Sequence, residues 1–200
     1  ATVPLKLELG EYHQVLRHLL AERVCIRDQE AILEALNHHL VPPREPANLG
    51  YSVMVDPGQL GPGGTFDKVR AALKSGPDDL AERVRKRIAR QLCESLADGE
   101  GVIEVAELRP GVEDLVRSSL EREGPRLVLA LRPDAEERLM RAMATAVDGL
   151  DRPVILCDPA IRLHVRRLVA RTRPDVAVLA RDEVHPAFRI QAVDQVSLSD

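Results

Sequence analysis

Residues 16–36 have the sequence LRHLLAERVCIRDQEAILEAL, and this stretch decides the first part of the fold. Apolar residues recur at helical spacing on both sides of its centre, which predicts a pair of helices within residues 10–40. The joint at 24–26, Val-Cys-Ile, contains neither glycine nor proline, so we expect a tight extended turn there. Asp28 follows this turn and suits the N-cap of the second helix, because its carboxylate can accept a hydrogen bond from the first helical turn.

Proline and glycine interrupt the chain after this helix pair. VPPREPANLG at 41–50 and DPGQLGPGG at 56–64 cannot belong to a continuous helix. Between them, YSVMV at 51–55 has the composition of a short strand, and Thr65 suits the cap of a short helix.

The clearest helix is predicted at 78–97. Leucine, valine and isoleucine recur there at every fourth position, and the other sides carry arginine and lysine. Asp78 or Asp79 is expected to cap it.

Strands and helices alternate in the remainder of the chain. The predicted strands are 101–108, 127–131, 153–157, 176–180 and 188–193, and the predicted helices among them begin at Pro110, Asp134 and Pro159. The strand at 153–157, PVILC, is apolar throughout, as is typical of strands buried on both faces. The order strand, helix, strand implies a right-handed crossover between parallel strands.

These elements predict a fold of the α+β or α/β class with two subdomains. Residues 1–124 are expected to form a mainly helical subdomain with a Pro/Gly-rich insertion at about 41–76. Residues 125–200 are expected to form a small α/β subdomain with a short parallel or mixed sheet.

The composition excludes several classes of function. Two phenylalanines, two tyrosines and no tryptophan leave too few rings for stacking on single-stranded nucleic acid, and a net charge of −4 argues against nucleic-acid binding in general. No apolar run approaches the roughly 20 residues that cross a bilayer, and the first ten residues lack the pattern of a signal peptide. The three cysteines, odd in number and far apart, indicate buried thiols in a reducing compartment.

The stretch at 16–36 resembles VLxxLLxExVxIRDxxxILExL, a signature of the FHIPEP family of export-gate proteins. Later segments are similar to the family in the same order, namely GPDDLAERVRKRIARQL at 76–92 and GVIEVAELRPGVEDLV at 101–116. The segment at 152–184, RPVILCDPAIRLHVRRLVARTRPDVAVLARDEV, is similar to PVLLxSPxLRxxLRxLLxRxxPxLxVLSxxEI. The resemblance covers about residues 5–40 and 77–185, whereas the insertion has no counterpart in the family pattern.

The resemblance implies the last two subdomains of the cytoplasmic region of a type III secretion or flagellar export gate. In the family this region forms a ring beneath an inner-membrane gate and receives chaperone–cargo complexes. The resemblance therefore implies a non-enzymatic docking and assembly module, located in the cytoplasm, with other copies of itself and export chaperones with their cargo as partners. It implies no catalytic residue, no cofactor and no metal. A repurposed scaffold that keeps the fold and binds another partner is the alternative.

A glycine-rich segment offers a further alternative, a nucleotide-binding enzyme. Residues 58–65, GQLGPGGT, have the spacing of GxxxxGK[ST], and PVILCD at 153–158 superficially resembles a Walker B strand. However, Gly64 stands where the phosphate-binding lysine is needed, and Pro62 removes a backbone N–H from the cradle. An irregular loop is therefore favoured.

The histidines do not predict a metal site. His38 and His39 are adjacent, so their side chains diverge by about 100° on a helix. His13 and His18 are five residues apart rather than four, and no cysteine lies at metal-ligand spacing from another.

Arginines gather on and after the helix predicted from Pro159; they are Arg162, Arg166, Arg167, Arg171 and Arg173. A solvated face paired with local acids is the favoured interpretation. The alternative is a contact with another subunit or partner, since arginine is enriched in interfaces, and Arg162 and Arg166 share a face.

Arg27 and Asp28 are the other candidate interface residues, because the resemblance implies that their turn belongs to the ring-building subdomain. The direct role expected for Asp28 is the helix cap, which contributes about 1 kcal/mol. Any interface role would be secondary to it.

Overall fold

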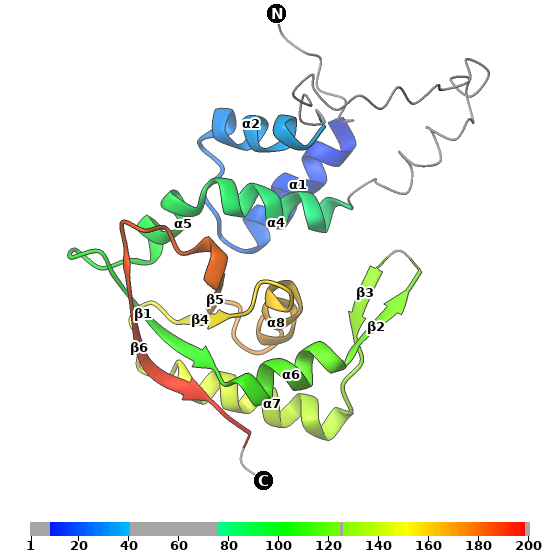
Figure 1. The fold of residues 1–200 in the computed structure, drawn as a ribbon, viewed down its shortest axis with the longest axis vertical. Helices are drawn as coiled ribbons and strands as arrows, with labels where there is room; N and C mark the ends of the chain where they lie inside the picture. The colour runs from blue at the N-terminus through cyan, green and yellow to red at the C-terminus, as the bar shows by residue number, and fades with distance from the viewer. Residues whose placement is uncertain (1–8, 41–75, 125, 199–200) are drawn as a thin grey trace, which may run out of the picture. The chain divides into compact units, whose positions relative to one another are not determined.

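The computed structural model describes residues 9–40, 76–124 and 126–198 (Figure 1). These residues belong to two compact units, residues 1–84 and 85–200. The strand predicted at 51–55 and the glycine-rich segment at 58–65, with the helix from Thr65, lie outside the described residues. Within the described ranges, none of the helices has the length and apolar character of a transmembrane segment.

The first unit contains the predicted helix pair. Helix α1 spans Leu9–Ala21 and α2 spans Gln29–Leu40, and the first eight residues of α4 (Pro77–Arg87) also belong to this unit. Their apolar stripes are buried, with Val15, Leu19, Ile32, Ala35, Leu36, Leu80, Ala81 and Val84 all less than a tenth exposed. The helical periodicity in the sequence therefore marked the buried faces correctly.

A Schellman motif ends α1 and starts the extended turn. The N–H of Arg23 donates to Leu20 O at 2.9 Å, and the N–H of Val24 donates to Leu19 O at 2.9 Å. Arg23 adopts a φ of 58°, a conformation that glycine usually supplies at this position. Because an arginine stands there instead, the sequence predicted the turn but not its left-handed residue.

The predicted N-cap of α2 is confirmed. Asp28 Oδ1 accepts a hydrogen bond from the N–H of Ala31 at 2.9 Å, which satisfies one of the donors that a helix start leaves unpaired. Gln29, the first residue of α2, bridges the turn, because its amide donates to Ile26 O and accepts from the Tyr12 hydroxyl.

The second unit is built on a parallel sheet whose strands lie in the order β5-β4-β1-β6 (Figure 1). Its strands are β1 (Val102–Leu108), β4 (Val154–Cys157), β5 (Ala177–Ala180) and β6 (Arg189–Val196). Strands β2 (Leu120–Glu123) and β3 (Arg126–Leu129) form a separate antiparallel hairpin. The predicted fold class is therefore confirmed, and the main sheet is parallel throughout.

Helices pack on both faces of this sheet. One core contains residues of α6 (Pro110–Ser118), α7 (Pro133–Ala146) and α8 (Arg162–Val169), and the other contains residues of α5 (Ala89–Leu96). Strand β4 shows the division, since Ile155 and Cys157 belong to the first core and Val154 and Leu156 to the second. The apolar run PVILC was thus correctly interpreted as a strand buried on both faces.

The continuous helix predicted at 78–97 is wrong in two respects. The chain forms α4 and α5 with a break at Ile88, whose φ of −94° and ψ of 20° are not helical. A stripe that repeats every four residues drifts by about 40° per step on an α-helix, so one straight helix cannot keep it facing a single core. Pro77 also occupies the first helical position, so Asp78 and Asp79 lie in the first turn and not at the cap.

Two further predictions needed correction. The strand predicted at 127–131 forms as β3, but within the described residues it pairs with β2 and not with the main sheet. Gly124, with a φ of 61°, permits the turn of this hairpin. Helix α8 is also shorter than the predicted segment from Pro159, because the carboxylate of Asp158 accepts the N–H of Ala160 at 2.8 Å in a turn that precedes it.

The subdomain boundary expected near residue 124 stays a prediction. The division between the two compact units falls between Val84 and Arg85, within α4. Strand β1, which precedes residue 124, pairs with both β4 and β6, which follow it.

Candidate functional site

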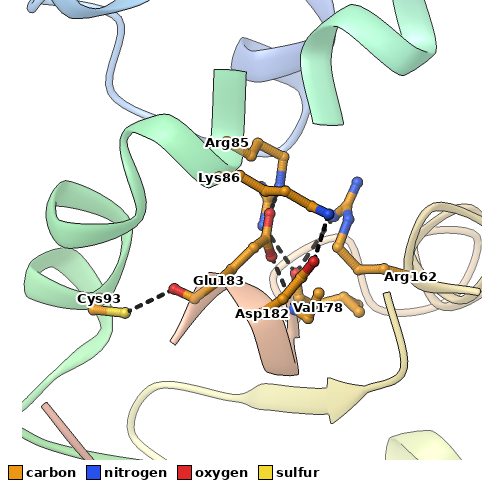
Figure 2. A network of polar contacts seen from close by, with 8 residues as sticks. Arg85, Lys86, Cys93, Arg162, Val178, Asp182 and Glu183 are labelled. Atoms are coloured by element: carbon orange, nitrogen blue, oxygen red, sulfur yellow. Dashed lines mark hydrogen bonds and ion pairs between the residues drawn. The ribbon is translucent and has the colours of Figure 1, made fainter. Parts of the chain in front are cut away.

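A buried ion pair joins Arg85 of α4 to Glu183 at the end of the η2 turn (Arg181–Glu183), which follows β5 (Figure 2). Arg85 Nε donates to Glu183 Oε1 at 2.7 Å, and Arg85 Nη2 donates to Oε2 at 3.0 Å. The two side chains are 5% and 1% exposed. Two parallel, charge-assisted bonds of this length give the buried pair a fixed geometry.

The backbone of β5 and a second arginine complete what we call the Arg85–Glu183 cluster, made of Arg85, Arg162, Val178, Ala180 and Glu183. The N–H of Ala180 donates to Glu183 Oε2 at 2.8 Å. The carbonyl of Val178 accepts from Arg85 Nη2 at 3.1 Å and from Arg162 Nη1 at 3.4 Å. Arg162 is fully buried, so the cluster brings two guanidinium groups to one carbonyl beside one carboxylate.

Local structure places these side chains. The η2 turn folds the chain back after β5, so the carboxylate of Glu183 bonds to the backbone of its own strand end. Arg85 lies on the buried side of α4, next to Val84 and one turn before Ile88, both of which are buried. The last turn of α4 and the end of β5 are thereby connected through charged groups.

Two neighbouring contacts hold the η2 turn further. Lys86 pairs with Asp182 at the surface, as Figure 2 shows. Cys93 of α5 donates to Glu183 O at 3.4 Å, and its sulfur accepts from the N–H of His185 at 3.4 Å. Burial raises the pKa of the Cys93 thiol, so this sulfur stays protonated at neutral pH and acts as a hydrogen-bonding group and not as a nucleophile.

A second charged network lies at the ends of β4 and β5. Glu113 of α6 accepts the N–H of Asp158 at 2.9 Å and Arg181 Nη1 at 2.7 Å, and Arg117 Nη2 lies 3.2 Å from Asp158 Oδ2. The carboxyl ends of parallel strands are where open α/β sheets commonly bind ligands. Here these charged side chains bond to one another and to the backbone.

These charged networks connect helices, strands and turns of the second unit to one another. Within the described residues, no three histidine, cysteine or acidic side chains are grouped so that they could hold a metal ion. Burial also raises the pKa of the Cys157 thiol far above neutrality, which leaves this residue inert.

Of the residues predicted from sequence, Arg27 and Asp28 are exposed in the first unit. Asp28 caps α2, as expected. Their role in an interface stays a prediction.

Arg162 and Arg166 share a buried face of α8, with 0% and 6% of their surface exposed. The favoured expectation of a solvated face is therefore wrong for these two residues, because Arg162 belongs to the Arg85–Glu183 cluster and Arg166 Nη2 donates to Pro174 O at 3.3 Å. It is correct for Arg171, which pairs with Glu136. The interface role predicted for Arg162 and Arg166 stays untested, and neither side chain offers much surface to a partner.

Arg85 and Glu183 were missed as a site by the sequence analysis. One signal for Arg85 was present, because it lies between Val84 and Ile88 on a side of the helix where the apolar stripe runs. Glu183 also had a signal, since it falls on the glutamate of the family pattern VLSxxEI, but an acidic residue after a strand is usually solvated, so its burial was not predicted.

The FHIPEP family model matches residues 65–189, which is more than half of the chain. The chain belongs to the FHIPEP family. The resemblance first seen around the IRD sequence at 26–28 is thereby confirmed.

Relatives within the FHIPEP family are flagellar and invasion proteins. The chain is 26% identical to the flagellar biosynthesis protein FlhA of Bacillus subtilis, over 98% of this chain and 25% of that protein. It is 24% identical to the invasion protein InvA of Salmonella typhimurium, over 92% of this chain and 23% of that protein. The chain therefore spans about a quarter of the length of these relatives.

Solved structures of FHIPEP relatives share the fold. The CdsV protein of Chlamydia pneumoniae superposes with a TM-score of 0.74 at 22% identity, covering 96% of this chain and 47% of that one, and CdsV has also been solved in complex with CdsO. The nonameric SctV-C of EPEC superposes with a TM-score of 0.71 at 20% identity, covering 95% of this chain and 49% of that one. At these identities the likeness establishes the fold alone.

Proposed function

We propose that this chain is a non-enzymatic docking and assembly module of a type III secretion or flagellar export gate. In this role, copies of the chain pack head-to-tail into a ring that faces the cytoplasm beneath an inner-membrane gate. The ring receives export chaperones with their cargo. Contacts of this heterologous kind close into a ring when the rotation between neighbours allows it.

The family match carries this proposal, and two comparisons support its parts. The related SctV-C is nonameric, which supports ring assembly of this chain. The related CdsV binds CdsO, which supports a protein partner. The charged clusters of the second unit agree with a rigid module, because they connect helices, strands and turns without presenting a reactive group.

Ring assembly is tested by raising the local concentration of the chain. A single interface between modules often fails to outweigh the entropic cost of association, so the free chain can remain a monomer in solution. Attaching the chain through an N-terminal histidine tag to a lipid monolayer that carries chelated nickel removes much of this cost. Electron microscopy of the monolayer is expected to show closed rings.

Two outcomes would contradict the proposal. One is a layer of separate particles at every surface density. The other is tight, magnesium-dependent binding of ATP in calorimetry, which would point to an enzyme built on the segment at 58–65. The matched control is the same monolayer with the tag at the C-terminus, which separates a failure of assembly from an unfavourable orientation.

A further inference from the structure

Strand β6 forms one edge of the main sheet, and much of it is exposed. It pairs with β1 on one side, and no described strand pairs with its other side (Figure 1). The five consecutive residues Gln191–Gln195 are all exposed. Edge strands of this kind are where an extended segment of another chain can add to a sheet through main-chain hydrogen bonds.

A groove runs between the C-terminal half of β6 and one face of α7. In Figure 1 these two elements, red and yellow-green, lie next to each other. The groove has a volume of about 340 Å³ and is open to solvent. We call it the β6–α7 groove, and its lining residues are Arg138, Arg141, Ala142, Thr145 and Ala146 from α7 and Asp194, Gln195, Ser197 and Leu198 from β6 and its continuation.

Two residues of the groove carry backbone groups that face away from β1. The carbonyl of Val196 accepts the N–H of Arg109, so the backbone groups of Val196 face β1. Because successive residues of a strand direct their backbone groups to opposite edges, those of Gln195 and Ser197 face away from β1. Both residues also line the groove. The small side chains of Ala142 and Ala146 leave room opposite them.

Two features of β6 hinder the pairing of another strand with its open edge. A β-bulge at Val193 breaks the register between β6 and β1, since Val105 pairs with Ala192 and Ala106 pairs with Asp194. The carboxylate of Asp194 accepts the N–H of Gln195 at 2.7 Å. An incoming strand would replace this exposed bond with a backbone carbonyl.

The charges on α7 indicate what kind of segment fits. Arg138 is exposed and forms no ion pair with any described residue, and Arg141 pairs only with the exposed Glu137 of its own helix. Exposed pairs within a helix are weak, so both guanidinium groups are available to another carboxylate. Among the described residues that line the groove, two are arginines and one, Asp194, is acidic, so their charges give a positive balance.

We propose that the β6–α7 groove binds an extended acidic segment of a protein partner. The segment adds to β6 as a fifth strand, and its acidic side chains pair with Arg138 and Arg141. A helix beside an edge strand is the arrangement that strand-adding recognition domains use, where backbone bonds give affinity and side-chain contacts give specificity. The inference rests on the proposed docking role for the choice of a protein as partner, but it does not require ring assembly.

The test uses the full chain and a labelled peptide of the length of β6, eight residues, in which glutamate alternates with valine and threonine. Fluorescence anisotropy is expected to show binding that weakens at least about tenfold when lysine replaces glutamate, because the charge complement is reversed. Two further peptides are N-methylated on alternate residues, one at odd and one at even positions. The peptide whose methyl groups block the N–H groups that face β6 should lose binding, and the other should keep it. This pair of isomers tests strand addition without any change to the protein.

Variants locate the binding site. Arg138→Glu combined with Arg141→Glu is expected to weaken binding about tenfold or more, whereas Asp194→Ala should strengthen it several-fold. Arg126→Glu, the same charge change on the β2–β3 hairpin, is the matched control and should bind as the unmodified chain does. Amide chemical shifts in NMR spectra should change for Gln195 and Ser197 on addition of the peptide.

Several outcomes would overturn the inference. These are no binding at millimolar peptide, equal loss in both N-methylated registers, or unchanged affinity in the double arginine variant. Dimerisation through β6 in sedimentation, competing with the peptide, would assign the edge to a second copy of the chain instead. The double arginine variant is also placed on the nickel monolayer. If it forms rings there, a failure of peptide binding counts against the groove alone and not against the proposed function.

Discussion

Arginines belong both to the Arg85–Glu183 cluster and to the β6–α7 groove, but their surroundings differ. In the cluster, Arg85 and Arg162 are buried and both donate to the backbone of β5, and Arg85 also donates to the carboxylate of Glu183. In the groove, Arg138 is exposed and unpaired among the described residues. Burial therefore decides whether an arginine of this chain stabilises its own fold or is available to a partner.

The same contrast exists within a single segment. Arg162 lies on α8 and Arg171 lies nine residues later, just after this helix, and both were expected to be solvated. Arg162 is fully buried, whereas the side chain of Arg171 is 61% exposed and pairs with Glu136. Arginines that are close together in sequence can therefore differ completely in burial and in the partners they bind.

The largest effect is expected when the carboxylate of the cluster is removed. Glu183→Gln keeps the shape and an acceptor for Ala180, but it removes the buried carboxylate that pairs with Arg85. We expect a loss of about 3–5 kcal/mol in the free energy of unfolding, measured by urea denaturation.

The double variant Arg85→Met with Glu183→Gln is the control for this prediction. It removes both charges of the pair, so it should be more stable than Glu183→Gln alone. If the double variant loses the sum of the two single losses, the pair does not act as a unit and the description of the cluster is incorrect.

The second prediction compares the two arginines directly. Arg162→Met should lower the free energy of unfolding by about 2 kcal/mol, because the charged hydrogen bond to Val178 is lost inside the protein. Arg171→Met should change it by at most about 1 kcal/mol, because its ion pair is largely solvated. Equal losses, measured under the same conditions of urea denaturation, would show that burial does not separate the two residues.

The sequence predicted those parts of the fold that local rules determine. The helix pair followed from apolar spacing, and the cap at Asp28 followed from its side-chain oxygen. Pro110 marked the start of α6, and the apolar run at 153–157 marked a strand buried on both faces. The family signature predicted the family, and with it the fold beyond these elements.

What the sequence did not predict depends on tertiary contacts. The left-handed Arg23 carries no glycine to mark it, and the break at Ile88 depends on which cores α4 and α5 enter. The burial of Arg162 goes with its bond to the carbonyl of Val178, 16 residues later in the chain, and the pattern of charges gives no sign of it. The groove beside β6 depends on strand order and on a bulge, which local periodicity does not encode.

The third prediction concerns the helix pair of the first unit. Asp28→Ala should lower the free energy of unfolding by about 1 kcal/mol, because the N–H of Ala31 loses its acceptor. Asp28→Asn is the matched control, since asparagine caps nearly as well, and it should change the stability little. A similar loss in both variants would mean that the charge of Asp28, and not its capping bond, carries the effect.

The smallest effect on stability is expected at the groove. Arg138→Glu changes an exposed residue without a partner among the described residues, so the free energy of unfolding should stay within about 0.5 kcal/mol of that of the unmodified chain. The same substitution should weaken the binding of the acidic peptide, and raising the salt concentration should weaken that binding in the unmodified chain, because exposed charges are screened. Loss of binding without loss of stability would show that Arg138 serves the groove. The arginines of the Arg85–Glu183 cluster, in contrast, are expected to affect stability. A loss of stability as large as that of Arg162→Met would instead place Arg138 among the structural arginines, and the proposed docking surface would have to be abandoned.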